Sequence, residues 1–203
     1  MVRVEINPQD PQERLIKKAA DELVRGSVIC YPTDTIYGIG CDIFNKKSIE
    51  RIYRIKGKGY KAPLSFICSD LSHIADYAHV SNYAYKIMRR CLPGPYTFVL
   101  PATRLVPKIM MSKRKTVGIR VPDNAICRTL LELFGNPVIS TSASLHDGQV
   151  LHFPEDIEQY LTSHIDFFLD SGPLGMDSST VLDLTGEQLV ILREGKGLDE
   201  LPV

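Results

Sequence analysis

The sequence predicts an α/β (α+β) protein in which residues 1–203 form a single domain around one open, twisted sheet of mixed strand direction. Helix-like and strand-like segments alternate along most of the chain, which is typical of this class. The late strand-like segments lack intervening helices, so we expect them to pair antiparallel. The composition, 44% hydrophobic and 24% charged, suits a packed domain that buries roughly 70% of its unfolded surface.

The first helix is expected to follow Asp10, which can cap it, with Pro11 at the first helical position. Glu13 then completes a capping-box pattern. Apolar residues recur at helical spacing until Gly26, which predicts the end of the helix.

The rest of the chain continues this alternation of elements. A buried strand is expected at 27–31, and a polar turn follows it at 32–35. Further helices are expected at 45–55, 71–77, 82–91, 124–134 and 155–160, and strands at 64–68, 96–100, 116–121 and 138–141 and around Phe167, Val181 and Val190. Gly57 predicts the end of the helix at 45–55.

The net charge of zero conceals two oppositely charged segments. Residues 1–120 hold 21 Lys and Arg against 10 Asp and Glu, a net +11, whereas residues 121–203 hold 3 against 14, a net −11. If the basic residues share one surface, that surface would attract phosphate chains such as nucleic acid. From the charge count alone, the better interpretation is that the two segments interleave in the fold and pair with one another.

Several classes of function lack support in the sequence. No apolar run approaches the roughly 20 residues of a membrane-spanning helix, and the N-terminal ten residues resemble no export signal, so we expect no membrane partner and a cytoplasmic location. The five cysteines have no C-x-x-C spacing, so we expect reduced thiols and no structural metal. The motifs of P-loop, Rossmann and G-x-S-x-G hydrolase sites do not occur.

Polar clusters follow several predicted strands and helices, at 33–38, 56–61, 140–144, 178–180 and 193–195. Loops that leave the same edge of a sheet converge, and hydroxyl, Lys and Arg groups there suit an anion or nucleotide site. Each cluster also has a plainer interpretation. The Thr33–Thr35 segment has the composition of a polar turn, and Lys56 suits a solvated helix end.

The clusters occur within an ordered series of motifs that resembles the YrdC/YciO-like family over nearly the whole chain. The series is Tyr31-Pro32-Thr33-Asp34-Thr35-Ile36-Tyr37-Gly38, Ile55-Lys56-Gly57-Lys58, Ala62-Pro63-Leu64, Pro93-Gly94-Pro95-Tyr96-Thr97, Thr116-Val117-Gly118-Ile119-Arg120-Val121-Pro122, Ser140-Thr141-Ser142-Ala143-Ser144, Ser179-Thr180-Val181-Leu182-Asp183 and Leu192-Arg193-Glu194-Gly195. The resemblance implies a YrdC/RibB-like fold with a concave basic face that binds double-stranded RNA.

The best-known members of that family are threonylcarbamoyl-AMP synthases, which join ATP, L-threonine and bicarbonate for modification of adenosine 37 of tRNA. The resemblance implies ATP or AMP with Mg²⁺ as ligands and double-stranded RNA or tRNA as partner. The implied catalytic residues are Lys56, Lys58, Ser142 and Ser144; the nucleotide-binding residues Thr116, Ser142 and Arg193; the threonine-binding residues Thr35 and Ser179; and the RNA-binding residues Lys56, Lys58, Lys61, Lys113, Arg114 and Lys115. Arg89 and Arg90 are expected on the same basic face.

The chain departs from the synthase pattern at three positions. Lys58 stands where synthases have Arg, Ser144 where they have Asn, and Ile67 where a His is common. Lys lacks the bidentate fork of Arg, and Ser lacks the paired donor and acceptor of an amide. Two hypotheses follow. The first is a YciO-like protein that binds nucleotide and double-stranded RNA, either without the synthase reaction or with weak or altered synthase activity, and the second is a fully active threonylcarbamoyl-AMP synthase.

Overall fold

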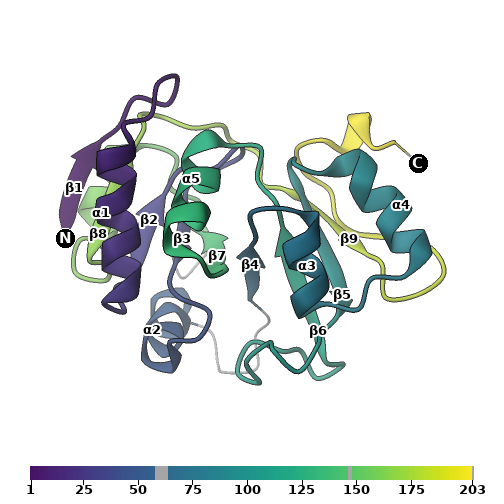
Figure 1. The fold of residues 1–203 in the computed structure, drawn as a ribbon. Coiled ribbons are helices and arrows are strands. Elements are labelled where there is room, and N and C mark those ends of the chain that lie inside the picture. The colour runs from purple at the N-terminus through teal and green to yellow at the C-terminus, as the bar shows by residue number, and fades with distance from the viewer. Residues whose placement is uncertain (58–63, 146–147, 203) are drawn as a thin grey trace.

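A computed structural model describes residues 1–57, 64–145 and 148–202 of the chain. Its ten strands form one mixed sheet in the order β1-β8-β2-β3-β7-β4-β6-β5-β9-β10, which confirms the predicted class (Figure 1). The strands are β1 (Val2–Glu5), β2 (Ile29–Tyr31), β3 (Gly38–Gly40), β4 (Ser65–Ile67), β5 (Tyr96–Pro101), β6 (Thr116–Arg120), β7 (Val138–Ser142), β8 (Phe167–Asp170), β9 (Thr180–Asp183) and β10 (Val190–Arg193).

The helices are α1 (Glu13–Val24), α2 (Lys46–Lys56), α3 (Leu71–Tyr77), α4 (Asn82–Cys91), α5 (Ala125–Phe134) and α6 (Pro154–Leu161), followed by a short 3-10 helix, η1 (Leu198–Glu200). Side chains cap four of them as the sequence favours, and Gly57 ends α2 in the left-handed conformation with φ 62°. The predicted cap Asp10 is wrong. Gln12 precedes α1 without a side-chain cap, and the helix begins at Glu13.

The late strands follow the antiparallel prediction only in part. Strands β9 and β10 pair antiparallel, but β8 pairs parallel with both β1 and β2, and β9 pairs parallel with β5. The chain crosses from one end of the sheet to the other between β8 and β9, so these two successive strands are not neighbours. The edge strand β1 and the glycine-flanked β3 had no clear alternation in the sequence and were not predicted.

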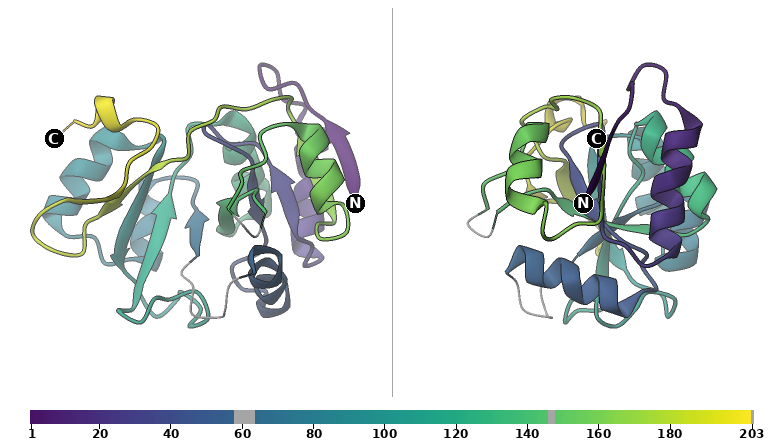
Figure 2. Two further views of the ribbon diagram at one scale, coloured as in Figure 1. Left: turned by 180° about the vertical axis from the view of Figure 1, so that it is seen from behind. Right: turned by 90° about the vertical axis from the view of Figure 1, so that its left-hand side faces the viewer.

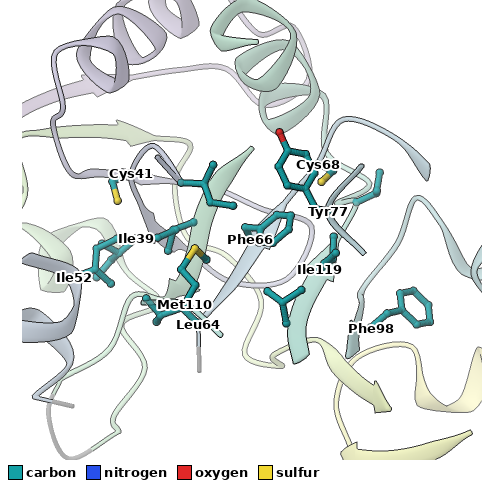
Figure 3. Packing of buried hydrophobic residues seen from close by; sticks show 14 of the residues in the cluster. Ile39, Cys41, Ile52, Leu64, Phe66, Cys68, Tyr77, Phe98, Met110 and Ile119 are labelled. Carbon is teal, nitrogen blue, oxygen red and sulfur yellow. The ribbon is translucent and has the colours of Figure 1, made fainter. Parts of the chain in front are cut away.

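Two hydrophobic cores lie on the two faces of this sheet. One contains side chains of α2, α3, α4 and α6, and the other contains side chains of α1 and α5. Figure 2 shows α6 (green) and α1 (purple) on opposite sides of the sheet. Figure 3 shows the first core, in which the rings of Phe66 and Tyr77 meet edge to face with centroids 5.5 Å apart.

The second face is covered by helices over only half of its width. On β7, Val138 belongs to the core under α1 and α5, and Ser140 and Ser142 follow on the same side of the strand. On β6, Thr116 and Gly118 line open space, while Val117 and Ile119 are buried in the first core. Small and polar residues therefore replace the core on this half of the face. None of the helices in the described ranges is long and apolar enough to cross a membrane.

Candidate functional site

A cavity of about 650 Å³ lies over the part of the sheet that carries no helix. Its floor comes from alternate residues of neighbouring strands, among them Ser65, Thr97, Gly118 and Ser140. A Cβ atom on Gly118 would lie 3.0 Å from Cβ of Ser65 and 3.3 Å from Cγ2 of Thr97. A glycine at this position therefore keeps the floor of the cavity open.

The structure brings most of the predicted ligand-binding residues to this cavity. Residues lining it include Thr35, Lys113, Arg114, Thr116, Ser142, Ser179 and Arg193. These positions come from segments far apart in the sequence, so the predicted convergence of the polar loops is present. Lys56, Ser144 and Lys115 do not line it, and Lys58 and Lys61 lie outside the described residues.

One wall of the cavity is built around the buried ion pair of Arg120 with Asp34. Their side chains are only 9% and 10% exposed. Arg120 also donates from Nη1 to Oγ1 of Thr35 at 2.9 Å and from Nε to the carbonyl of Gly94 at 3.4 Å. Within the described chain, Oδ2 of Asp34 is buried without a hydrogen-bond partner. This pair joins strand β6 to the loop that follows β2.

A second wall of the cavity is built around Arg193 at the end of β10. Its guanidinium donates to the carbonyl oxygen of Ser179 at 2.8 and 3.2 Å and to the hydroxyl of Ser179 at 3.1 Å. The hydroxyl groups of Ser179 and Thr97 are 2.9 Å apart. Partial burial, and then the nearby positive charge of Arg120, lower the pKa of the Arg193 guanidinium from its usual value. Because no salt bridge neutralises Arg193 within the described ranges, this wall favours an anion.

The segment after β10 crosses from this wall to the first one. Nζ of Lys196 donates to the carbonyl of Asp34 at 2.6 Å, and its backbone N–H donates to the carbonyl of Ser178 at 2.8 Å. A Cβ atom on Gly195 would lie 2.3 Å from the carbonyl oxygen of Ser178, so only glycine allows the backbone at 195 to lie this close to Ser178. The contact of Lys196 with Asp34 links the two walls of the cavity.

The predicted catalytic residue Lys56 is buried at the end of α2 beside β7. It is 7% exposed, and Nζ donates to the carbonyl of Ser142 at 3.0 Å and to the hydroxyl of Ser144. Its ammonium group therefore supports the end of β7 from behind the cavity lining. This burial contradicts the interpretation of Lys56 as a solvated helix end, whereas its catalytic and RNA-binding roles stay predictions.

In the part of the chain that the structure describes, the predicted basic residues do not all lie on one face. Lys113 and Arg114 lie at the cavity, in a loop where the Ser112 hydroxyl accepts from the N–H groups of Arg114 and Thr116 at 3.2 and 3.1 Å. Arg89 and Arg90 are exposed on α4, which packs on the opposite face of the sheet. The prediction of a single basic face that includes these two residues is therefore wrong.

Sequence reasoning missed several residues of the cavity. Arg120 and Thr97 stood inside quoted motifs without an assigned role, and Asp34 was assigned only to a turn. For Arg120, the alternation of residues along β6 was a usable signal. Thr116, Gly118 and Arg120 occupy every second position of this strand, between buried apolar residues, and therefore share one face of the sheet. Ile67, which departs from the synthase pattern, does not line the cavity. Its side chain is fully buried in the core under α1 and α5.

The donor set of the cavity suits a phosphorylated ligand. Guanidinium and hydroxyl groups bind phosphate and ribose oxygens, and cavities of 300–1,000 Å³ hold small-molecule ligands. Within the described ranges no group of three His, Cys, Asp or Glu side chains could hold a metal ion. Asp183 is a carboxylate on the cavity wall, and Mg²⁺ bound to a nucleotide requires only one or two protein carboxylates. Among the residues that line the cavity, Asp183 is therefore a carboxylate that could hold Mg²⁺ beside a phosphate group.

Fold and cavity define the class as an α/β protein with a ten-stranded mixed sheet and a cavity lined by arginine and hydroxyl side chains. Residues 21–195 match the model of the Sua5/YciO/YrdC family, described as Telomere recombination, and the chain belongs to this family. The uncharacterized protein YciO of Escherichia coli is 41% identical over 194 residues, which span 95% of this chain and 94% of YciO. The threonylcarbamoyl-AMP synthase of Bos taurus is 31% identical over 91% of this chain and 69% of its own.

Solved structures agree with this assignment. The crystal structure of Escherichia coli YciO matches with a TM-score of 0.91 and 40% identity, over 97% of both chains. The structure of P. abyssi Sua5 complexed with L-threonine matches with a TM-score of 0.90 and 27% identity. That match covers 96% of this chain and 58% of the P. abyssi chain. The fold described here therefore corresponds to part of that longer protein.

Proposed function

We propose that the cavity binds ATP together with L-threonine and forms threonylcarbamoyl-AMP from bicarbonate more slowly than the synthases do. The observation that carries this proposal is the pair of arginines that face one cavity, Arg120 and Arg193, each bonded to a hydroxyl group. Support comes from relatives that are threonylcarbamoyl-AMP synthases and from the L-threonine complex of P. abyssi Sua5.

In this proposal two sets of cavity residues take different parts of the reaction. Thr35 and Ser179 contact the amino acid, while Thr116, Ser142 and Arg193 contact the nucleotide. The threonine nitrogen bonds to the carbon of bicarbonate with loss of water, and a carbamate oxygen then displaces pyrophosphate from the α-phosphorus of ATP. Positive charge from Arg193 stabilises the negative charge that develops on phosphate oxygens. Asp183 could hold Mg²⁺ beside the phosphates, where the ion would supply further charge neutralisation.

The lower rate follows from the position of Lys56 and from the departures in the sequence. The ammonium of Lys56 is bonded to Ser142 and Ser144 and does not line the cavity. Synthases have Asn where this chain has Ser144 and Arg where it has Lys58, and loss of one preorganised donor typically costs about 10²–10³ in rate. A fully active synthase remains the alternative, and activity equal to that of a synthase would favour it.

Calorimetry with Mg-ATP and L-threonine tests the proposed ligands. We expect both to bind, and Arg193→Ala to weaken ATP binding by about 10–100-fold because a charge-assisted contact is lost. Arg90→Ala removes an exposed arginine on the opposite face and serves as the matched control, which should leave both affinities unchanged. Absence of ATP binding at millimolar concentration, or an equal effect of the two variants, would contradict the proposal.

Double-stranded RNA is the second proposed ligand, favoured by the position of Lys113 and Arg114 at the cavity. Within the described residues neither forms a salt bridge, so both are available to phosphates. Duplex binding should weaken between roughly 50 and 200 mM salt, and the double variant Lys113→Ala/Arg114→Ala should lower the salt slope by about one per lost contact. Arg89→Ala/Arg90→Ala is the control. A salt-independent affinity, or equal slopes for both variants, would refute RNA binding at this rim.

A further inference from the structure

The hydroxyl groups of Thr33 and Thr35 form a closed hydrogen-bond arrangement at the cavity wall. Both residues line the cavity although they are only 4% and 3% exposed. Their Oγ1 atoms are 3.0 Å apart, and either oxygen could in principle donate to the other. The surrounding contacts decide which one does.

Thr33 has no proton available for Thr35. Its hydroxyl donates to the carbonyl of Ile36 at 2.7 Å, and a carbonyl oxygen can only accept. The proton between the two threonine hydroxyls must therefore come from Thr35. Thr33 Oγ1 also accepts from the backbone N–H of Thr35 at 3.1 Å, which fills its remaining lone pair.

Thr35 in turn receives a hydrogen bond that cannot be reversed. Nη1 of Arg120 donates to Oγ1 of Thr35 at 2.9 Å, and a guanidinium group has no acceptor. The hydroxyl of Thr35 thus donates a hydrogen bond to Oγ1 of Thr33 and accepts one from Arg120. One lone pair remains for a ligand in the cavity, so Thr35 can accept from that ligand but cannot donate to it.

Contacts behind Arg120 hold this arrangement in place. Asp34 is its ion-pair partner, and Lys196 binds the carbonyl of Asp34 at 2.6 Å. Ser179 on the second wall provides a contrast. It accepts from Arg193, but the proton between Ser179 and Thr97 can lie on either oxygen. The hydrogen-bond direction is therefore fixed on the Thr35 wall and adjustable on the Ser179 wall.

We propose that Arg120 and Thr33 are positioning residues that make Thr35 an obligate acceptor, so that the site selects a ligand presenting a hydroxyl or ammonium donor there. The identity of that ligand as L-threonine rests on the proposed function, whereas the direction of the hydrogen bonds does not. A buried acceptor left unpaired disfavours analogues that lack the donor.

Affinities for L-threonine and two analogues test the selectivity. L-2-aminobutyrate lacks the hydroxyl group, and 3-hydroxybutyrate lacks the ammonium group. We expect one of them to bind about ten- to a hundredfold more weakly than L-threonine, which identifies the donor that meets Thr35. In Thr35→Val that difference should fall to within about threefold, while Thr35→Ser, which keeps the hydroxyl, should retain it.

Arg120→Lys tests the positioning role, because Lys keeps the charge but cannot reproduce the fork that contacts Asp34 and Thr35 together. A folded Arg120→Lys protein should lose the preference, whereas Arg193→Lys should keep it. The proposal is overturned if both analogues bind native protein as L-threonine does, or if Thr35→Val leaves the preference intact.

Neutron diffraction from crystals grown in heavy water tests the hydrogen-bond direction without any ligand. The deuterium on Oγ1 of Thr35 should point to Thr33, and a deuterium on Nη1 of Arg120 should point to Thr35. A Thr35 deuterium directed into the cavity would overturn the proposal. If L-threonine fails to bind but the deuterium points to Thr33, the proposed function fails and the acceptor assignment stands for another donor ligand.

Discussion

Replacing Arg120 with methionine should destabilise the protein strongly, because it leaves a buried carboxylate without its cation. Methionine keeps much of the length of the side chain but removes its charge and all of its donors. In the described structure, Oδ2 of Asp34 already lacks a partner, and the only side chain bonded to Oδ1 is Arg120. After the substitution neither oxygen of the Asp34 carboxylate has a side-chain partner among the described residues. The carbonyl of Gly94 also loses the hydrogen bond from Arg120.

The expected loss is about 4 kcal/mol. Breaking a buried ion pair by removing one partner costs about 3–5 kcal/mol, and the two side chains here are only 9% and 10% exposed. For a chain of this length each kcal/mol lowers Tm by about 2–4 °C, so a decrease of roughly 8–16 °C follows. The double variant Asp34→Asn/Arg120→Met removes the stranded charge and should be more stable than Arg120→Met alone.

Urea unfolding at neutral pH measures these differences in the free energy of unfolding. They appear as shifts in the midpoint urea concentration while the dependence of the free energy on urea stays constant. Lys17→Met is the matched control, because it breaks an exposed ion pair with Asp21 and should cost less than about 1 kcal/mol. If Arg120→Met costs no more than this control, or if the double variant is less stable than Arg120→Met, the reasoning about the buried pair is refuted.

Three further predictions concern the pocket and the core. Lys58→Arg with Ser144→Asn should raise threonine- and bicarbonate-dependent pyrophosphate release, by up to about 10²–10³-fold for each restored contact; an unchanged rate in a folded double variant would contradict this. Gly118→Val should lower ATP affinity at least about tenfold, because even its Cβ would lie 3.0 Å from the side chain of Ser65, and unaltered affinity by calorimetry would show that the ligand binds elsewhere. The five cysteines are buried, and burial raises the pKa of their thiols, for Cys91 to about 11, so a thiol-specific chromogenic reagent at pH 8 should react only after unfolding; reaction of any thiol in the native protein would argue against this packing.

Local chemistry made the helices and most strands predictable. The side chain of Asn124 caps the start of α5, and Gly57 ends α2 in the left-handed conformation. Both effects depend only on residues that are close together in the sequence. The order of strands was not accessible in the same way. Strand β8 pairs with β1 and β2 because of contacts between segments more than a hundred residues apart, which no local pattern encodes.

The same distinction applies to the cavity. Hydroxyl-rich strand ends predicted convergence of Thr35, Ser142 and Ser179, and the structure places all three on one cavity. The role of Arg120 depends on Asp34, 86 residues away, and the burial of Lys56 depends on Ser144, 88 residues away. Residue type gave each side chain its possible chemistry, but only tertiary packing decided which groups meet a ligand.

Pyrophosphate release by the purified protein with Mg-ATP, L-threonine and bicarbonate tests the central claim most directly. We predict slow release that requires both threonine and bicarbonate, is accompanied by threonylcarbamoyl-AMP, and falls further in Arg193→Ala. The Arg90→Ala control should release pyrophosphate at the native rate. Release that is independent of threonine, or none above the protein-free reaction while ATP still binds, would contradict synthase chemistry in this cavity.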